Sequence, residues 1–345
     1  MRIAHVIWAL GTGGVETMLV DIVNAQVETE VVAITVINDI VDKSLLYKID
    51  SRCKIGLFRR KVGSRSLLPW IKLNAFLLCF RPDIIHFHLE GMRKMVFNPA
   101  PKVFTIHNAY SSNKEYPKYK ALYAISEGVR NYTLQQGYDS VIIWNGIDSG
   151  NIDIKNSNKT NNLCKIVCIG RLRIIHKGQD ILIDALHLLK QRGIQNVHLD
   201  LIGDGESKEM LEEKIKEYDL QSQVSLLGRK DRTYVYKHLK DYDLFVLPSR
   251  SEGFGLSVAE AMCAKVPVLV SNLDGPLGVI DYGRLGMFFI SENPQSLAEQ
   301  IDGFIQKGPD AKMINEAYQY ATEHFDVNRT ARQYVDEYKK VLGLS

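Results

Sequence analysis

The stretch Glu252-Gly253-Phe254-Gly255-Leu256-Ser257-Val258-Ala259-Glu260 follows an apolar run at residues 244–247 and leads into a helix-like segment. It therefore places two carboxylates around a corner between a strand and a helix. The glycines let the backbone approach a ligand closely, and a helix that begins near Ser257 directs unpaired amides and its positive dipole end into the same space. This arrangement suits a phosphate, with Glu252 and Glu260 able to accept hydrogen bonds from hydroxyl groups on either side of it. A sugar nucleotide has that layout.

The same nine residues also have a purely structural interpretation. Ser257 and Glu260 fit a capping box, in which Glu260 would only satisfy backbone amides at the start of the helix. Glu252 would then be one more solvated acid in a loop. Taken alone, the nine residues leave both interpretations open.

The wider pattern, Glu-Gly-Phe-Gly-Leu-x-x-x-Glu-Ala-Met after a strand and Pro-Ser, resembles the Glu-x7-Glu signature of retaining glycosyltransferases of family 4. The resemblance implies an α/β protein of the GT-B architecture, with two doubly wound Rossmann-like domains whose parallel sheets face a central cleft. In that family the first Glu contacts the donor sugar and the second contacts the ribose, which implies these roles for Glu252 and Glu260. It also implies donor contacts from Phe254, Gly255 and Leu256.

Composition limits the class of protein. The 345 residues are enough for about two domains, and 46% hydrophobic with 24% charged residues is typical of a soluble globular protein. A net charge of +3 without a dense Lys/Arg block argues against a nucleic-acid partner. No stretch approaches the ~20 apolar residues of a membrane span, and the five scattered cysteines are typical of reduced packing residues. We therefore expect a cytoplasmic protein.

Short β-branched runs alternate with amphipathic helical stretches in both halves, a pattern typical of two parallel, doubly wound sheets. A polar segment without apolar periodicity lies between the halves. We predict an N-terminal Rossmann-like domain at residues 1–150, a linker at 151–162 and a C-terminal Rossmann-like domain at 163–326. The resemblance assigns the acceptor to the first domain and the nucleotide sugar to the second, and it places the C-terminal helix, 327–345, back on the first domain. Strands are expected at residues 3–8, 31–37, 84–87, 102–106, 123–125, 141–143, 165–169, 197–202, 224–227, 244–247, 267–270 and 287–289.

A glycine turn, Gly11-Thr12-Gly13-Gly14-Val15-Glu16, follows the first predicted strand. The dinucleotide fingerprint Gly-x-Gly-x-x-Gly needs glycine at position 16, where this chain has Glu16, so NAD binding loses its main support. A Gly-Gly pair with Glu two places on instead resembles the first loop of the family, whose backbone lies against the donor diphosphate. This implies donor contacts at Gly13 and Gly14. A plain strand-to-helix turn is the alternative.

The segment Gly170-Arg171-Leu172-Arg173-Ile174-Ile175-His176-Lys177-Gly178 places two cations after another predicted strand, where open α/β sheets bind ligands. Arg171 can grip phosphate oxygens bidentately and Lys177 adds a compact charge, so together they would neutralise a leaving diphosphate. Two solvated surface charges are the alternative. The Gly-Arg-Leu and Lys-Gly pairing resembles the family, although the loop between them is slightly long. Arg229, after a later strand, lies where family members contact the nucleobase.

Two histidine motifs end strands of the first half. Thr105-Ile106-His107-Asn108 resembles the family segment whose histidine reaches the donor sugar, which implies a role for His107. His86-Phe87-His88 places two imidazoles on one face, but no third ligand is evident, so we predict a cleft-lining or core role and no metal site. Asp241-Tyr242-Asp243 resembles the Asp-x-Asp metal motif of another glycosyltransferase class, yet its position before a strand favours a polar strand entry.

Two segments depart from or extend this pattern. The family usually has Gly-Gly-x-x-Glu before a helix, whereas this chain has Asp274-Gly275-Pro276-Leu277-Gly278, so local geometry near Gly278 is expected to differ. Leu57-Phe58-Arg59-Arg60-Lys61 and residues 65–80 mix basic and apolar side chains, and we hypothesise that they contact a membrane surface. The alternative is that the apolar residues are the buried face of a helix.

The residues and the resemblance together predict a retaining, metal-independent hexosyltransferase that needs no cofactor. It would move a sugar from a nucleotide-sugar donor to a glycan or lipid-linked acceptor hydroxyl in cell-surface polysaccharide or glycolipid assembly. The membrane hypothesis would place it at the inner face of the cytoplasmic membrane. The catalytic residues would be Glu252, His107, Arg171 and Lys177. A sugar-nucleotide epimerase of the same architecture and a non-catalytic nucleotide-binding partner subunit are the alternatives.

Overall fold

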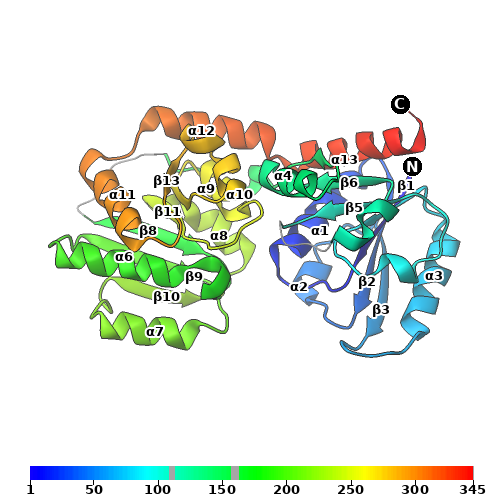
Figure 1. Cartoon of the computed structure of the whole chain (residues 1–345), viewed down its shortest axis with the longest axis horizontal. Coiled ribbons are helices and arrows are strands. Elements are labelled where there is room, and N and C mark those ends of the chain that lie inside the picture. The colour runs from blue at the N-terminus through cyan, green and yellow to red at the C-terminus, as the bar shows by residue number, and fades with distance from the viewer. Residues whose placement is uncertain (109–112, 157–162, 345) are drawn as a thin grey trace. The chain divides into compact units, whose positions relative to one another are not determined.

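The computed structural model describes residues 1–108, 113–156 and 163–344, which divide into two compact units (Figure 1). Unit 1 comprises Met1–Asp148 and Phe325–Ser345, and unit 2 comprises Ser149–His324. Each unit has one parallel sheet with helices packed on it. The alternation of buried strands with amphipathic helices therefore gives the α/β class that the sequence predicts.

Unit 1 has a seven-stranded sheet in the order β3-β2-β1-β4-β5-β6-β7. Five of the six residues of β1 are buried, as expected for a parallel strand covered on both faces. The strand order reverses between β1 and β4, and ligands of open α/β sheets bind at the carboxyl ends beside such a switch point. The strands are β1 (Arg2–Ile7), β2 (Val31–Asn38), β3 (Lys54–Arg60), β4 (Ile84–Phe87), β5 (Lys102–Ile106), β6 (Ala121–Ala124) and β7 (Val141–Ile142).

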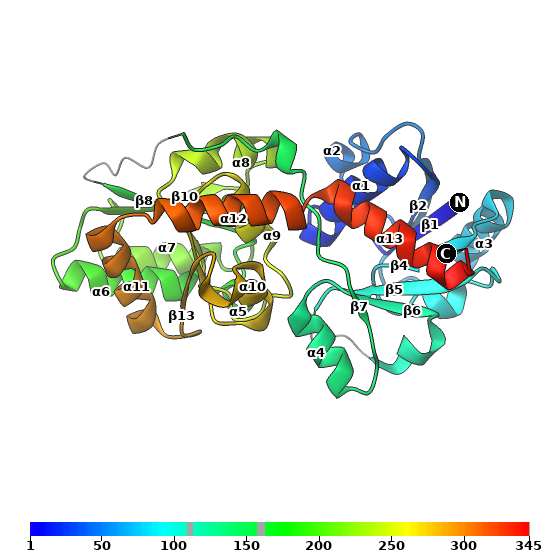
Figure 2. The same ribbon diagram turned by 90° about the horizontal axis from the view of Figure 1, so that it is seen from above.

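The helices of unit 1 come from both ends of the chain. The last one, α13, packs beside α1, and both lie together in Figure 2. The carboxylate of Asp326 caps α13 by accepting hydrogen bonds from the amides of Asn328 and Arg329. Just before the helix, the Phe325 carbonyl accepts from the Ile147 amide at 2.7 Å. The helices are α1 (Gly14–Gln26), α2 (Lys43–Leu46), α3 (Leu68–Phe80), η1 (Arg93–Met95), η2 (Asn113–Lys118), α4 (Glu127–Gln135) and α13 (Val327–Leu342).

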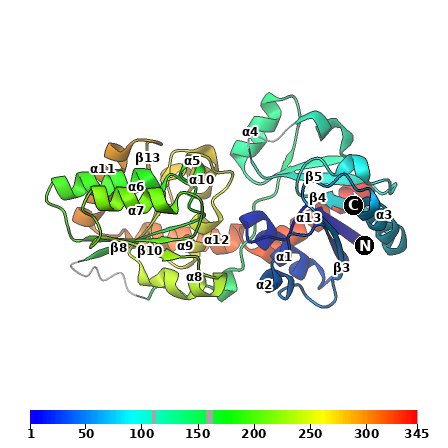
Figure 3. The ribbon, with the colours of Figure 1, turned by 90° about the horizontal axis from the view of Figure 1, so that it is seen from below.

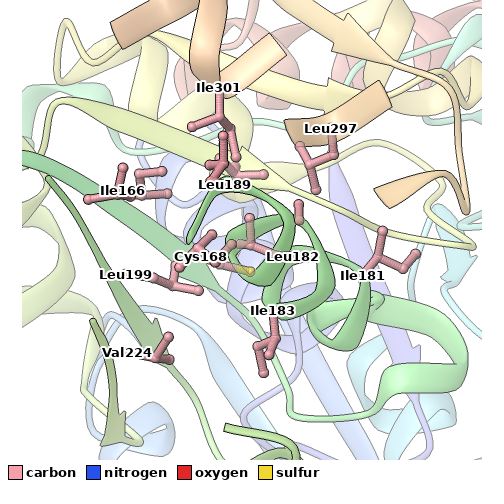
Figure 4. Close-up of a cluster of buried hydrophobic side chains, with 14 of the residues drawn as sticks. Ile166, Cys168, Ile181, Leu182, Ile183, Leu189, Leu199, Val224, Leu297 and Ile301 are labelled. Carbon is pink, nitrogen blue, oxygen red and sulfur yellow. The ribbon is translucent and has the colours of Figure 1, made fainter. Parts of the chain in front are cut away.

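Unit 2 has a six-stranded sheet in the order β10-β9-β8-β11-β12-β13. Its core lies between the sheet and α6 and α11, where Ile166, Leu189 and Ile301 pack together (Figure 4). The strands are β8 (Cys164–Ile169), β9 (Val197–Ile202), β10 (Val224–Gly228), β11 (Leu244–Leu247), β12 (Val268–Ser271) and β13 (Met287–Phe289). The helices are η3 (Ser149–Asn151), α5 (Ile174–Lys177), α6 (Gln179–Gln191), α7 (Lys208–Glu217), α8 (Arg232–His238), η4 (Leu239–Asp241), α9 (Leu256–Cys263), α10 (Asp274–Val279), η5 (Asp281–Gly283), α11 (Pro294–Lys307) and α12 (Ala311–His324).

Each strand predicted from the sequence is present, with bounds that differ by at most two residues. The sequence did not predict β3, an edge strand that contains a glycine and ends in two arginines, since neither feature favours a strand. The Phe58 ring of β3 contacts the Phe76 ring of α3, so this part of the basic segment belongs to the fold of unit 1. Within the described residues, no helix has the length and apolar character needed to cross a bilayer.

The segment expected as a linker packs on unit 2 where the structure describes it. The amide of Asp153 donates to the Tyr236 carbonyl at 3.0 Å, and the amide of Lys155 donates to the Ala264 carbonyl at 2.9 Å. The Lys155 ammonium also pairs with the Asp243 carboxylate at 2.7 Å. Residues 151–156 are therefore held by unit 2 and do not form a free connection, and the rest of the expected linker, 157–162, lies outside the described residues.

Candidate functional site

The candidate site of unit 2 lies at the carboxyl ends of β8 and β11. These strands are neighbours, and the strand order reverses around β8, so their following loops emerge at the switch point of the sheet. Arg171 and Lys177 follow β8, and Glu252 follows β11. The topology therefore brings together the two segments that the sequence singled out.

Lys177 and Glu252 are in direct contact. The Lys177 ammonium donates to Glu252 Oε2 at 2.6 Å, and the two side chains are 29% and 16% exposed. The Lys177 side chain passes over Gly170, where an added Cβ would lie 3.8 Å from Lys177 Cδ. If this half-buried ion pair at a strand end separates, the lysine ammonium can bind an anion and the glutamate carboxylate can accept a hydrogen bond from a hydroxyl group.

Gly178 fixes the position of Lys177. It has φ 63° and ψ 25°, a left-handed conformation, and an added Cβ would overlap the Pro248 carbonyl oxygen. Only glycine combines this conformation with so close a backbone approach. The corner between α5 and α6 therefore rests directly on the end of β11, four residues before Glu252.

Arg250 and Asp180 brace this corner, and the sequence analysis did not identify either residue. The guanidinium makes two parallel hydrogen bonds to the Asp180 carboxylate at 2.7 and 2.8 Å and a third to the Ile174 carbonyl at 2.8 Å. The ion pair with Asp180 raises the pKa of Arg250. The backbone amide of Arg250 also donates to the His176 carbonyl at 2.8 Å. Arg250 therefore joins the loop that carries Glu252 to the helix that carries Lys177.

The helix α9 begins at Leu256 with Gly255 as its N-cap, at φ 101° and ψ 61°. No side chain of the described residues caps this end, and the N-cap is Gly255 and not Ser257, so the capping box considered for Ser257 and Glu260 is not formed. An uncapped helix start at the ligand edge of a sheet provides amide donors and a partial positive charge for an anion. Phe254 is only 1% exposed, so its side chain is a core residue and its backbone is the part that could contact a ligand.

Glu260 lies beside a cation that the sequence analysis missed. The Nε atom of Arg232 is 3.8 Å from Glu260 Oε1, and the Arg232 guanidinium also stacks over the Tyr236 ring, 4.8 Å from its centroid. Arg232 is the first residue of α8, just after β10. Arg229, which the resemblance singled out, is exposed in the same connection.

Arg171 is an exposed cation of the group. Its side chain is exposed, and it forms no ion pair or hydrogen bond with any residue within the described ranges. The backbone is nonetheless fixed, since the Arg171 carbonyl accepts from the Gln179 side-chain amide at 2.9 Å. A fixed backbone with an unpaired guanidinium at a strand end can receive an anionic group without first losing another partner.

The unusual glycine segment before α10 lies against the Glu252 loop. An added Cβ on Gly275 would be 2.6 Å from the Glu252 carbonyl oxygen and 2.7 Å from the Gly253 carbonyl carbon. Gly275 and Gly278 are both buried. The start of α10 therefore supports the backbone of Glu252 by close packing, which requires glycine at position 275.

In unit 1, the first glycine turn begins α1 as predicted. Gly13 is the N-cap and Gly14 the first helical residue. A Cβ on Gly13 would overlap the Glu16 carboxylate, which folds over the first turn of the helix. A diphosphate at the backbone of Gly14 would have to displace this carboxylate, because both groups are anionic.

His107 follows β5 and is held neutral by its surroundings. Both ring nitrogens are inaccessible, and neither has a hydrogen-bond partner among the described residues. Burial lowers the pKa of His107 to about 4, so the imidazole is uncharged at neutral pH. Its ring lies 5.8 Å from that of His88, which follows the neighbouring strand β4.

The His86-Phe87-His88 motif belongs to a buried hydrogen-bond network that includes a third imidazole, His5 of β1. His5 Nδ1 and His88 Nε2 are 2.9 Å apart, and His5 Nε2 is 2.8 Å from Oε1 of the Gln26 side chain. The His86 nitrogens lie 2.6 Å from the Tyr338 hydroxyl and 2.7 Å from the Thr105 hydroxyl. Burial lowers the pKa of each of these histidines, to about 4 for His5.

The three imidazoles place one nitrogen each within 4.8 Å of one another, a spacing that a metal ion could use. Both nitrogens of His86 are already hydrogen bonded to hydroxyl groups, so metal binding there would break at least one of those bonds. We therefore retain the core role that the sequence predicted for this motif, with α13 as its partner.

The Asp241-Tyr242-Asp243 motif has separate partners for its two acids. Asp243 accepts from the Lys155 ammonium at 2.7 Å and from the Lys165 amide at 3.0 Å. Asp241 lies 2.8 Å from His238 Nδ1. The motif precedes β11 and so lies at the amino end of that strand, opposite the edge that carries Glu252. It forms the polar strand entry expected from the sequence.

Two family models match consecutive parts of the chain. Residues 12–150 match the model described as Glycosyltransferase Family 4, and residues 151–321 match the model described as Glycosyl transferases group 1. With the two parallel-sheet units, these matches define a protein of the GT-B fold, an architecture of glycosyltransferases.

Individual relatives cover the chain to different extents. An uncharacterized glycosyltransferase of Methanocaldococcus jannaschii is 29% identical over 180 residues, which are 52% of this chain and 45% of that protein. This chain therefore spans less than half the length of that relative. The lipopolysaccharide core biosynthesis glycosyltransferase LpsD of Rhizobium meliloti is 28% identical and matches 82% of this chain and 81% of its own length. Anabaena HepE, solved in complex with UDP-glucose, has a TM-score of 0.83 at 21% identity and matches 99% of this chain and 100% of its own.

Proposed function

We propose that the protein is a retaining glycosyltransferase that moves a sugar from a nucleotide-sugar donor to an acceptor hydroxyl. The observation that carries this proposal is the contact of Lys177 with Glu252 beside Arg171 and the start of α9, neither of which has a side-chain partner in the part of the chain that the structure describes. Three positive elements and one carboxylate at the ligand edge of one sheet suit a diphosphate joined to a polyhydroxylated group. The likeness to HepE, solved with UDP-glucose, supports the same donor class.

Each residue has a distinct part in the proposed reaction. Lys177 leaves Glu252 and, with Arg171, binds the diphosphate and neutralises the charge that grows on it as the sugar departs. Glu252 then accepts hydrogen bonds from the sugar hydroxyls, and Glu260 accepts them from the ribose. The acceptor attacks on the face that the leaving group vacates, and a phosphate oxygen takes its proton, so the protein needs no base of its own. On unit 2, the remaining donor contacts are proposed to come from the backbone of Phe254, Gly255, Leu256 and Arg229. On unit 1, the proposed donor contacts come from Gly13, Gly14 and His107.

The acceptor is proposed to be a glycan or a lipid-linked glycan at the cytoplasmic side of a membrane. LpsD acts in the biosynthesis of lipopolysaccharide core by its description, and the match covers most of both chains. Unit 1 is the proposed acceptor unit, and unit 2 the donor unit. Cell-surface polysaccharide or glycolipid assembly is the process that we propose for this chain.

Ligand-induced stabilisation tests the donor class. A nucleoside diphosphate or its sugar conjugate, at 100 times its dissociation constant, is expected to stabilise the folded protein by about 2.7 kcal/mol. The measurement is the Tm in a panel of nucleotides and nucleotide sugars, with inorganic sulfate as the control for general anion binding. No shift with any nucleotide would contradict the proposal. Conversion of a donor without any acceptor would indicate an epimerase.

Turnover in excess chelator tests the role of the cations. We expect transfer to continue at an essentially unchanged rate, because Arg171, Lys177 and the start of α9 take the place of a divalent ion at the diphosphate. The measurement compares initial rates with chelator alone and then with added magnesium or manganese. Strict metal dependence would contradict this part of the proposal and direct attention to other acids.

A further inference from the structure

The helix α3 of unit 1 is apolar on two opposite faces. One face packs on the sheet through buried residues that include Trp70, Leu73 and Leu77. On the other face, Leu68, Ile71 and Leu78 are 55%, 62% and 71% exposed, although they lie three or seven residues apart and so share one side of the helix. A helix on the surface of a soluble unit ordinarily exposes polar residues on its outer face. The outer face of α3 therefore needs a partner.

A neighbouring segment extends this apolar face. The Asn74 side chain accepts from the Phe97 amide and donates to the Met95 carbonyl, each at 2.8 Å. These bonds hold Phe97 beside α3, where its side chain is 76% exposed. Leu67, just before the helix, is 61% exposed. We call the exposed residues of this region the α3 surface: Leu67, Leu68, Ile71, Leu78 and Phe97.

The chain around the α3 surface carries only positive charge. No Asp or Glu occurs between Asp50 and Asp83, a stretch that contains eight Lys and Arg residues, whereas the net charge of the whole chain is only +3. Arg60 is used within the fold, where its guanidinium donates to the Asn38 side chain at 3.2 Å. The other cations near the helix are exposed and form no ion pair with any residue of the described ranges: Arg59, Lys61, Arg65 and Lys72.

We propose that the α3 surface docks unit 1 on an anionic phospholipid bilayer. Aliphatic and aromatic side chains enter the interface between headgroups and acyl chains, while surrounding cations attract the lipid phosphates. Each cation near such a surface raises binding by roughly fivefold. The helix lies at the periphery of unit 1 in each view, so a flat partner can reach it (Figure 3).

The charge pattern favours lipid over a protein partner. A two-fold contact between two copies would bring one α3 surface against another and place like charges together. Protein interfaces are also depleted in lysine relative to the rest of the surface, whereas lysine is favoured near anionic lipid. This inference deepens the proposed function, because a membrane-bound acceptor would be reached from the same surface.

Sedimentation with vesicles tests the proposal. The probes are vesicles of 30% phosphatidylglycerol in phosphatidylcholine and vesicles of phosphatidylcholine alone, at low and at high salt. We expect binding to the anionic vesicles that weakens with salt. Replacing Arg59, Lys61 and Arg65 by Gln is expected to lower the partition coefficient by about 100-fold, as three fivefold factors multiply. Replacing Leu68, Ile71 and Leu78 by Ser is expected to lower it by at least tenfold, because less apolar surface is buried.

A matched triple variant separates local from overall charge. Arg192, Lys216 and Lys307 of unit 2 are also exposed and unpaired among the described residues, so their replacement by Gln removes the same charge elsewhere. Equal losses in the two charge variants, or no binding to anionic vesicles, would overturn the proposal. So would a dimer in solution that the Ser variant converts to a monomer, since a second copy would then cover the surface. The nucleotide-induced Tm shift, measured without lipid, is expected to remain in every variant, so failure here is distinguishable from failure of the proposed function.

Discussion

Replacement of Glu252 by Ala is expected to lower the rate of sugar transfer by on the order of 100-fold or more while nucleotide binding persists. Removal of a single group that stabilises a transition state commonly has this effect. Glu252 is proposed to hold the sugar and not the diphosphate, so the Kd for the nucleoside diphosphate should change little. Loss of the carboxylate also frees Lys177, its 2.6 Å partner, for the phosphates. The measurements are initial transfer rates and nucleotide binding by calorimetry.

Two further variants sharpen this test. Arg171→Ala is expected to weaken both transfer and nucleotide binding, because the unpaired guanidinium is proposed to contact the diphosphate in the ground state as well. Glu206→Ala is the matched control. Glu206 is a half-exposed acid that pairs with Arg173 at 2.8 Å in a neighbouring loop, and its loss is expected to leave both quantities unchanged. Transfer at a near wild-type rate by the Glu252 variant would refute its assigned role.

Acid is expected to unfold unit 1 before unit 2. The pKa values of His5, His86 and His88 are lowered by complete burial, so the unfolded state binds more protons than the folded state at acidic pH. Their contribution to stability is therefore fully present above the unfolded value of ~6.5 and is lost as the pH falls toward about 4, the value for His5. Each such histidine lowers the free energy of unfolding by about 1.4 kcal/mol per pH unit within this range. The free energy of unfolding of unit 1 is therefore expected to fall steeply over this range, and ordinary domain stability is small enough for such a loss to unfold the unit.

The positions of the tryptophans make this difference measurable. Trp8, Trp70 and Trp144 all belong to unit 1, so tryptophan emission reports on that unit while far-ultraviolet circular dichroism reports on both. Urea titrations from pH 7.5 to pH 4.5 should show the emission transition moving to lower urea well before half of the helical signal is lost. Surface carboxylates titrate in both units, so unit 2 serves as the internal reference. Coincident transitions at every pH would show that the buried histidines do not control the acid response.

The strand-to-helix corner at Glu252 could be predicted from sequence because its parts are local. An apolar run, two glycines and a helix-like segment are read within some fifteen residues, and the loop containing Arg171 and Lys177 is equally compact. The Arg250–Asp180 brace could not be predicted, since its partners are 70 residues apart and meet only after β8 and β11 become neighbours. The burial of the Phe254 side chain could not be predicted either, because a glycine-rich loop gives no indication of which residue turns into the core.

The buried histidines show a different limit. His5 and His86 lie in direct register on adjacent parallel strands, yet they are separated by eighty-one positions and five intervening elements. His5 could have been recognised as the third imidazole only if β1 had been known to lie next to β4, and local sequence patterns do not specify the order of strands in a sheet. The α3 helix is similar: its composition indicated an apolar segment, and the interpretation as the buried face of a helix is correct for one side only, while membrane contact by the other side stays a proposal. Leu73 and Leu77 are core, whereas Ile71 and Leu78 are exposed.

The partnership between α13 and the histidines also has a consequence for synthesis on the ribosome. Tyr334 and Tyr338 supply hydroxyl groups to Thr105 and His86. All of residues 149–324 are translated between these partners. While that stretch emerges, the nascent unit 1 has strands but lacks the helix that covers its buried imidazoles, whereas unit 2 is continuous and can fold as it is made. The first segment to leave the ribosome is thus among the last to reach its final structure.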